Sequence, residues 1–385
     1  MTGNIAVTPE RRTDLAKPTL SSQRKLLICV FLLIATLGPD LLCSSAYSSQ
    51  QSEDPRTLAP GVPVDQEIAG GQSQIWQVFL SSGDYLRLSV DRKRINIVAE
   101  LFAPGQSRQS GDKPLLSTAD GNALTSHQGV SVFSYIAESS GSYRLEINAS
   151  NKEPAPKRYT MKIEEQRPAT PEDKIRVAAE RAEFEGVRTR DSVTMEGRRQ
   201  TIAHYERSLA LWRELGDRKS ELRLLQRLIN HYHLLGDIQV ALGYAGKGIE
   251  IAQALEKRYD EANLNAMLGN IYQDLGNNQQ ALDAFSQARE TFASSSSRMG
   301  EATAIENIGI SYHLLGDPQR AIGYFHQAAA TFSSMRHKSM ECKSFNDLAA
   351  AYLKLGDLEK ALDFQNRALA LAREIGDVMI VARTL

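Results

Sequence analysis

The chain has 385 residues, of which 42% are apolar and 24% are charged, and its formal net charge is −1. This length suggests two or three domains, and the composition excludes wholesale disorder. A near-neutral chain with no basic tract and no interleaved aromatic stripe argues against nucleic acid as a partner.

The N-terminus has the pattern of a secretory signal. A basic, polar stretch precedes an apolar run over residues 26–37, Pro39 breaks that run, and small residues follow at 44–46. We therefore expect a signal peptide over residues 1–46 and a secreted or periplasmic protein. The run is shorter than the roughly 20 apolar residues of a membrane span, so no stable span is expected after signal removal. The alternative is a membrane anchor formed by residues 26–42.

A polar linker over residues 47–57 leads into a segment, residues 58–166, whose hydrophobic pattern has a period of two. Short alternating runs separated by Gly-rich turns predict an antiparallel β-sandwich. In Tyr85–Val90, for example, polar and apolar residues alternate as in a strand with one solvated face. The expected strands are Val64–Ala69, Gln72–Leu80, Tyr85–Asp91, Asn96–Phe102, Val130–Ala137, Ser142–Asn148 and Tyr159–Glu164.

The segment carries Ile75–Leu80 followed by Ser82–Leu88, then Ala99–Phe102 and Gly141–Leu145. With these motifs it resembles the bacterial pre-peptidase C-terminal family of small β-sandwiches, which accompany secreted enzymes as accessory modules. Some members carry acidic metal positions, but no matching carboxylate cluster is present here, so no metal site is expected. Trp76 is expected to have a core or strand-pairing role rather than to form a ligand platform.

From Arg218 the chain repeats every forty residues, in four units that span residues 218–377. Gly after a helical run predicts a helix end, and the Asp or Asn that follows suits the start of the next helix. Pro318 would then fall in a first helical turn, and the glutamates would be favourable charges in that turn. The aligned columns are Glu221, Glu261, Glu301 and Glu341; Tyr232, Tyr272, Tyr312 and Tyr352; Gly236, Gly276, Gly316 and Gly356; and Ala241, Ala281, Ala321 and Ala361.

The stretch Leu268-Gly269-Asn270-Ile271-Tyr272, followed by Ala281 and Phe285, resembles the tetratricopeptide pattern L-G-x-x-Y…A-x-x-x-F. A divergent first unit is expected over residues 171–217, with its first helix beginning near Pro171. The expected fold class is therefore an α+β multidomain chain, an all-β sandwich followed by an all-α tetratricopeptide (helix-turn-helix) solenoid.

The tetratricopeptide resemblance implies a non-catalytic scaffold whose first helices line a concave groove that binds a protein or peptide. An amide can both donate to and accept from an extended backbone, which suits the column of Asn230 and Asn270. The alternative is a solvated helix face without a ligand. The candidate groove residues are Asn230, His233, Asn270, Gln273, Asn307 and His313.

Residues 378–385 begin a further first helix that stops after eight residues. The last complete unit would then have a poorly covered apolar face, which suggests a fragment, a truncated frame or a partner that contacts this repeat. The order of signal, sandwich and repeats also resembles the front of large secreted proteins that end in a CHAT domain, a caspase-like cysteine protease. The alternative function is thus the non-catalytic front portion of such a protease.

No catalytic constellation is found, and no cofactor or metal is expected. Cys342 takes a position that other repeats fill with small or apolar residues, which favours a core thiol over a nucleophile. The histidines, among them His233 and His313, are scattered among the units, and spacing assigns none of them a carboxylate partner.

Overall fold

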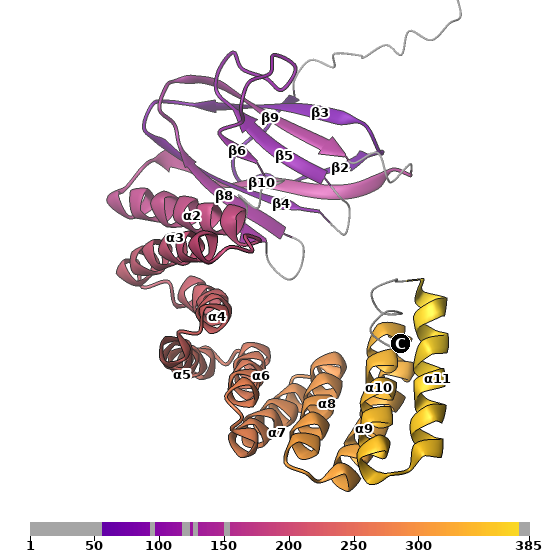
Figure 1. Ribbon diagram of the computed structural model, residues 1–385. Coiled ribbons are helices and arrows are strands. Elements are labelled where there is room, and N and C mark those ends of the chain that lie inside the picture. The colour runs from indigo at the N-terminus through magenta and orange to yellow at the C-terminus, as the bar shows by residue number, and fades with distance from the viewer. Residues whose placement is uncertain (1–55, 93–96, 118–123, 126–129, 150–154, 377–385) are drawn as a thin grey trace, which may run out of the picture. The chain divides into compact units, whose positions relative to one another are not determined.

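A computed structural model describes residues 56–92, 97–117, 124–125, 130–149 and 155–376 (Figure 1). This part of the chain contains a sheet-rich region followed by ten helices, as the sequence predicts. The expected signal peptide and the expected incomplete repeat lie outside the described residues.

The sheet-rich region consists of two five-stranded sheets, with strand orders β1-β3-β9-β5-β6 and β2-β10-β4-β8-β7. Neighbouring strands are antiparallel, except that β1 runs parallel to β3. The strands are β1 (Arg56–Thr57), β2 (Val64–Ile68), β3 (Ser73–Leu80), β4 (Asp84–Asp91), β5 (Ile97–Phe102), β6 (Leu116–Ser117), β7 (Leu124–Thr125), β8 (Val130–Ile136), β9 (Gly141–Ala149) and β10 (Lys157–Pro168).

Each of the seven expected strands is observed within a few residues of its predicted bounds. The sequence prediction missed β1, β6 and β7, because a strand of two residues is too short to show alternation. It also ended β10 too early. That strand continues to Pro168 because its second half pairs with β4.

The core of this region lies between the two sheets and follows the period-two pattern. Val78 of β3, Leu88 of β4 and Leu145 of β9 are fully buried. Trp76 is only 3% exposed, so the predicted core role is confirmed and a surface platform is excluded. Alternate residues of these strands therefore form one hydrophobic core.

The helices form five pairs, and the first helices of the four regular repeats begin forty residues apart, at Arg218, Arg258, Arg298 and Lys338. None of the described helices combines the length and apolarity that a membrane crossing needs. The bounds are α2 (Pro171–Thr189), α3 (Met195–Glu214), α4 (Arg218–Leu235), α5 (Ile238–Ala254), α6 (Arg258–Asp274), α7 (Asn278–Ser294), α8 (Arg298–Leu314), α9 (Pro318–Ser334), α10 (Lys338–Leu355) and α11 (Leu358–Ile375).

The turns inside the repeats have the chemistry that the columns predict. The glycine column adopts positive φ, from 75° at Gly276 to 85° at Gly236, which a side chain would disfavour. The Asp or Asn that follows each glycine is the N-cap residue of the second helix. The side chains of Asp317 and Asp357 accept backbone N–H groups there, whereas those of Asp237 and Asn277 make no such hydrogen bond. Pro318 is the first residue of α9.

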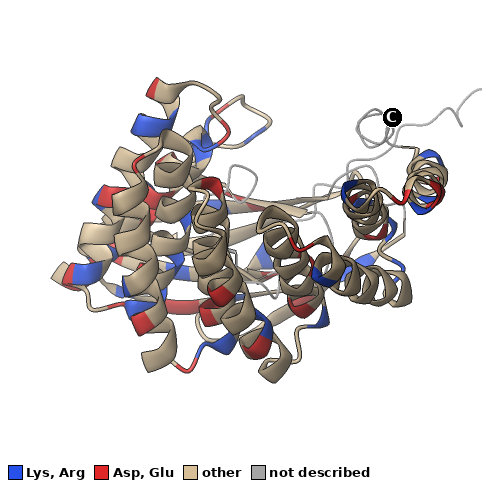
Figure 2. Cartoon of the chain, turned by 60° about the horizontal axis from the view of Figure 1, so that its bottom comes forward, with Lys and Arg blue, Asp and Glu red and all other residues tan. Residues whose placement is uncertain are grey.

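Small residues let the two helices of a repeat approach each other. An added Cβ on Gly269 of α6 would lie 2.5 Å from the ring of Phe285 on α7, and one on Gly309 would lie 2.7 Å from Phe325. Both phenylalanine rings are buried. The glycine before the tyrosine of the motif is therefore a packing requirement. In the view of Figure 2, basic and acidic residues are interspersed along the helices.

Candidate functional site

The candidate residues all lie on first helices. Helix α4 contacts α6, α6 contacts α8, and α8 contacts α10, so these four helices form a continuous face. Polar side chains occupy the seams between them. The six predicted residues thus lie on α4, α6 and α8, in surroundings that differ from one residue to the next.

Asn230 and Asn270 are the most accessible of the candidates. They occupy equivalent positions of α4 and α6, and both are exposed. Neither amide has a side-chain or backbone partner among the described residues. Both groups are therefore available to donate to and accept from an incoming chain.

His233 has a carboxylate partner that the sequence spacing did not assign. Its Nε2 lies 2.9 Å from Oδ2 of Asp274, and the two side chains join α4 to α6. The imidazole side chain is 20% exposed, whereas the carboxylate is 69% exposed. Spacing within one helix does not reveal this pair, since its members are 41 residues apart and belong to adjacent repeats.

Gln273 is held by the next repeat. Its Nε2 donates to Oγ of Ser311 over 3.0 Å, and the backbone oxygen of Asn307 lies 3.5 Å away. The oxygen of Asn307 also accepts from Ser311. Gln273 therefore ties α6 to α8 and has less freedom to bind a ligand than the two asparagines.

His313 of α8 is half-buried. Its Nδ1 is buried and has no hydrogen-bond partner in the described part of the chain. Burial, together with the nearby positive charge of Lys354, lowers the pKa of its imidazole. Nζ of Lys354 donates to the backbone oxygen of His313 over 2.7 Å, which joins α10 to α8. This histidine is therefore neutral near pH 7.

Two buried glutamates in these seams were missed by the sequence reasoning. Glu183 of α2 accepts two hydrogen bonds from Arg223 of α4, at 3.0 and 2.9 Å. Glu306 of α8 lies 2.8 Å from Nζ of Lys343 and accepts from Ser344 over 2.7 Å. Burial raises the pKa of Glu306, although Lys343 opposes this shift. A sequence signal exists, since each cation follows its glutamate by about one repeat length.

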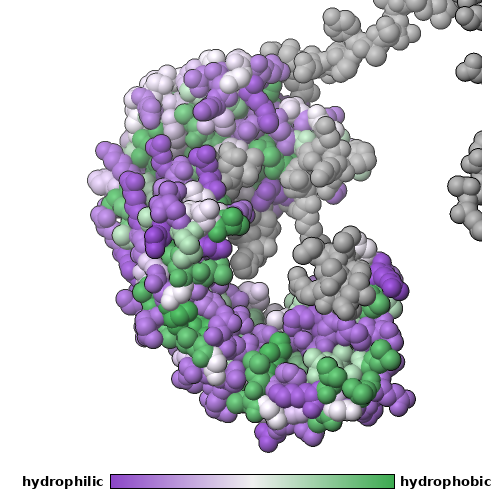
Figure 3. All heavy atoms as spheres, viewed as in Figure 1, coloured by the Kyte–Doolittle hydropathy of each residue, from purple (hydrophilic) through white to green (hydrophobic). Residues whose placement is uncertain are grey.

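Leucines are exposed where the first helices end. Leu234 is 59% exposed, Leu314 50% and Leu353 60%. Leu234 follows Asn230 by four residues and therefore lies on the same side of α4. Figure 3 shows separate hydrophobic patches amid polar surface over the repeat helices.

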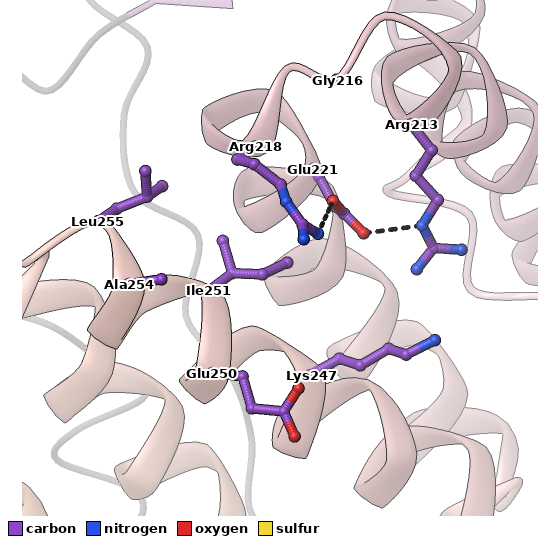
Figure 4. Close-up of a pocket in the computed structure, with 9 residues that line it drawn as sticks. All are labelled: Arg213, Gly216, Arg218, Glu221, Lys247, Glu250, Ile251, Ala254 and Leu255. Atoms are coloured by element: carbon purple, nitrogen blue, oxygen red, sulfur yellow. Dashed lines mark hydrogen bonds and ion pairs between the residues drawn. The ribbon is translucent and has the colours of Figure 1, made fainter.

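A separate pocket of about 640 Å³ lies where α3 ends, α4 begins and α5 ends (Figure 4). Glu221 is buried at its wall and binds Arg213 over 2.8 Å and Arg218 over 3.0 Å. Burial opposes the charged carboxylate, but hydrogen bonds from both arginines outweigh it and lower the pKa of Glu221. Lys247 also lines the pocket, and Ile251, Ala254 and Leu255 form its apolar side.

No cluster of three or more metal-binding side chains occurs among the residues that the structure describes. The thiol of Cys342 is buried and donates to the backbone oxygen of Ala368 over 3.2 Å. Cys342 therefore lies in the repeat core, as the sequence predicts.

Comparison with known families and structures identifies the helical region. A tetratricopeptide-repeat family model matches residues 260–334, and a second model with the same description matches residues 342–375. The C-terminal region therefore contains tetratricopeptide repeats. A search of curated proteins gives no match.

Many solved structures are similar to this chain, and two of them serve as examples. The crystal structure of aspartyl phosphate phosphatase F from Bacillus subtilis has 17% identity and a TM-score of 0.51, over 55% of this chain and 55% of that one. The apo form of RapI has 18% identity and a TM-score of 0.50, over 56% of this chain and 58% of that one. The match thus spans little more than half of either structure, and the likeness concerns the fold of the helical repeats.

Proposed function

We propose, on the premise that its C-terminal helices are tetratricopeptide repeats, that this protein is an interaction scaffold that binds an extended peptide segment of a partner protein. The binding face is that of the first helices α4 and α6. From the sequence pattern of residues 1–46, the scaffold acts outside the cytoplasm.

The observation that carries the proposal is the pair of unpartnered, exposed amides at equivalent positions of adjacent helices. An extended backbone presents N–H and C=O groups at regular intervals, and each amide can bind both kinds of group. In the described residues, Asn230 and Asn270 leave these bonds unmade, whereas His233 and Gln273 already bind the neighbouring repeat. The free amides are therefore the proposed binding positions, and the bound side chains hold the helices in place.

The exposed leucine beside the first amide indicates what else the partner offers. Leu234 lies next to Asn230 on α4 and is 59% exposed. A peptide whose backbone meets the amide would bring a side chain against this leucine. The partner segment is therefore expected to carry apolar residues as well as a free backbone edge.

The experiment uses a peptide-display library selected against the full chain. The tightest peptide is then measured by calorimetry against the variant Asn230→Ala/Asn270→Ala. The loss of two or more hydrogen bonds predicts an affinity about tenfold weaker or worse. The matched control is Gln239→Ala/Gln280→Ala, which removes two exposed amides from the second helices α5 and α7.

The control variant is expected to bind as the unchanged protein does. If the selected peptide bound the Asn230→Ala/Asn270→Ala variant as tightly as the control variant, these asparagines would not belong to the binding site. If Leu234→Ser also left the affinity of the peptide unchanged, the first-helix face would not be the binding surface.

A further inference from the structure

The pocket between α3, α4 and α5 has a chemistry that the repeat architecture does not require. Its positively charged lining residues are Arg213, Arg218 and Lys247, and its negatively charged ones are Glu221 and Glu250. Glu221 is already bound by both arginines. One positive charge is therefore in excess at the pocket wall, beside an apolar surface.

The next repeat shows what the fold alone needs at this place. There the equivalent glutamate, Glu261, is bound by Gln253 over 2.8 Å and by Arg258 over 3.0 Å. At the position of Arg213 the next repeat thus has a neutral glutamine, and this glutamine still makes the contact between units. At the position of Lys247 the next repeat has Gln287, which is also neutral. Arg213 and Lys247 together are therefore particular to one place in the array.

Both cations retain unused donors. Arg213 contacts Glu221 through Nε, and neither its terminal amino groups nor the ammonium of Lys247 has a partner among the described residues. Figure 4 shows the Lys247 side chain extending toward the same side of the pocket as the guanidinium of Arg213. An anionic group placed there would be bound by two positive charges at once.

The apolar side of the pocket favours a ligand in which an apolar group adjoins the anionic group. Where this pocket has Ile251 and Leu255, the next repeat has the polar residues Thr291 and Ser295. We propose that this pocket is a second binding site, which takes a carboxylate-bearing peptide segment in which an acidic residue adjoins an apolar one. The carboxylate lies between Arg213 and Lys247, and the apolar side chain lies against Ile251 and Leu255.

This site shares no residue with the amides Asn230 and Asn270, so it stands whether or not the first-helix face binds a peptide. The probe is the acetylated, amidated dipeptide Leu-Glu, and its neutral analogue Leu-Gln is the reference. Binding of both to the full chain is measured by ligand-observed NMR at low ionic strength. Because the site is partly solvated, the affinity is expected to be about millimolar and to fall in about 0.3 M salt.

The decisive variant is Arg213→Gln/Lys247→Gln, which gives the pocket the two glutamines of the next repeat and keeps a donor for Glu221. It is expected to bind Leu-Glu about tenfold more weakly, with an unchanged unfolding midpoint. The converse variant, Gln253→Arg/Gln287→Lys/Thr291→Ile/Ser295→Leu, gives the next repeat both the cations and the apolar side, and it is expected to add a second equivalent of bound Leu-Glu.

Three results would overturn the site: the absence of saturable Leu-Glu binding, equal binding of Leu-Gln, or unchanged Leu-Glu binding by the Arg213→Gln/Lys247→Gln variant. A peptide selected for the first-helix face should be unaffected by that variant. Each of the two proposed sites can therefore be disproved independently of the other.

Discussion

The carboxylate of Glu180, on α2, accepts a hydrogen bond from the backbone N–H of Ser134, on β8, over 3.0 Å. The other carboxylate oxygen accepts from the hydroxyl of Ser134 over 3.2 Å, and that hydroxyl lies 3.0 Å from the buried Tyr85 hydroxyl. One buried side chain thus binds the first helix of the array to a strand of the sheet-rich region. Arg167 of β10 makes a second link, to Asp173 in the first turn of α2.

The first prediction concerns the proton on Glu180. Burial raises the pKa of this carboxyl from 4.5 to about 7, while Arg87, both hydrogen bonds from Ser134 and Arg176 act in the opposite direction. The folded state therefore binds the proton more tightly than the unfolded state does. This difference stabilises the folded state by on the order of 3 kcal/mol. The stabilisation is fully present below about pH 4.5 and is lost as the pH rises through about 7.

Glu180→Gln keeps an acceptor for Ser134 and cannot ionise. Urea unfolding between about pH 5 and pH 8 should show that the unchanged protein loses stability relative to this variant. A difference between the two proteins that does not vary with pH would contradict a raised pKa at this position.

The second prediction concerns the ion pair between repeats. Glu183 is fully buried and holds Arg223 through two hydrogen bonds, with Arg227 at 3.7 Å. Glu183→Gln leaves these cations without a counter-charge and should cost about 3 kcal/mol of unfolding free energy. Glu183→Leu/Arg223→Leu removes both members of the hydrogen-bonded pair and leaves only Arg227, whose side chain is 33% exposed, so it should recover much of that loss. A double variant as unstable as the single one would show that the pair itself, rather than an uncompensated charge, determines the stability.

The third prediction compares two glycines inside helices. Gly269→Ala would place a methyl group 2.5 Å from the buried ring of Phe285, whereas an added Cβ on Gly243 of α5 has no neighbour within 4 Å. Alanine favours a helix by about 1 kcal/mol over glycine at either position. Overpacking against Phe285 should outweigh this gain at Gly269, for a net loss of about 1 kcal/mol, and Gly243→Ala should be stabilising. Thermal unfolding measures both, and equal shifts would rule out the packing explanation.

Much of the fold follows from the sequence because its signals are local and repeated. The glycines from Gly236 to Gly356, forty residues apart, mark helix ends at which the backbone enters the left-handed region. The alternation in β4 likewise predicts which of its residues meet the core. Such patterns need only the neighbours along the chain.

The contacts between repeats and those with the sheet-rich region depend on residues far apart in sequence. His233 meets Asp274 and Glu183 meets Arg223 because neighbouring first helices lie side by side, so an offset of about one repeat would have suggested both pairs. No such regularity connects Glu180 with Ser134, since the strand and the helix belong to different kinds of structure. Of the candidate residues, only the exposure of Asn230 and Asn270 agrees with a free binding position, and their role stays a prediction.

The most direct test of the scaffold is amide hydrogen exchange of the full chain, with and without the peptide selected from the display library. Bound peptide should slow exchange in α4 and α6, whose faces carry Asn230 and Asn270, and leave exchange in the second helix α7 unchanged. Protection that is confined to second helices, or to the β-strands, would contradict peptide binding on the first-helix face.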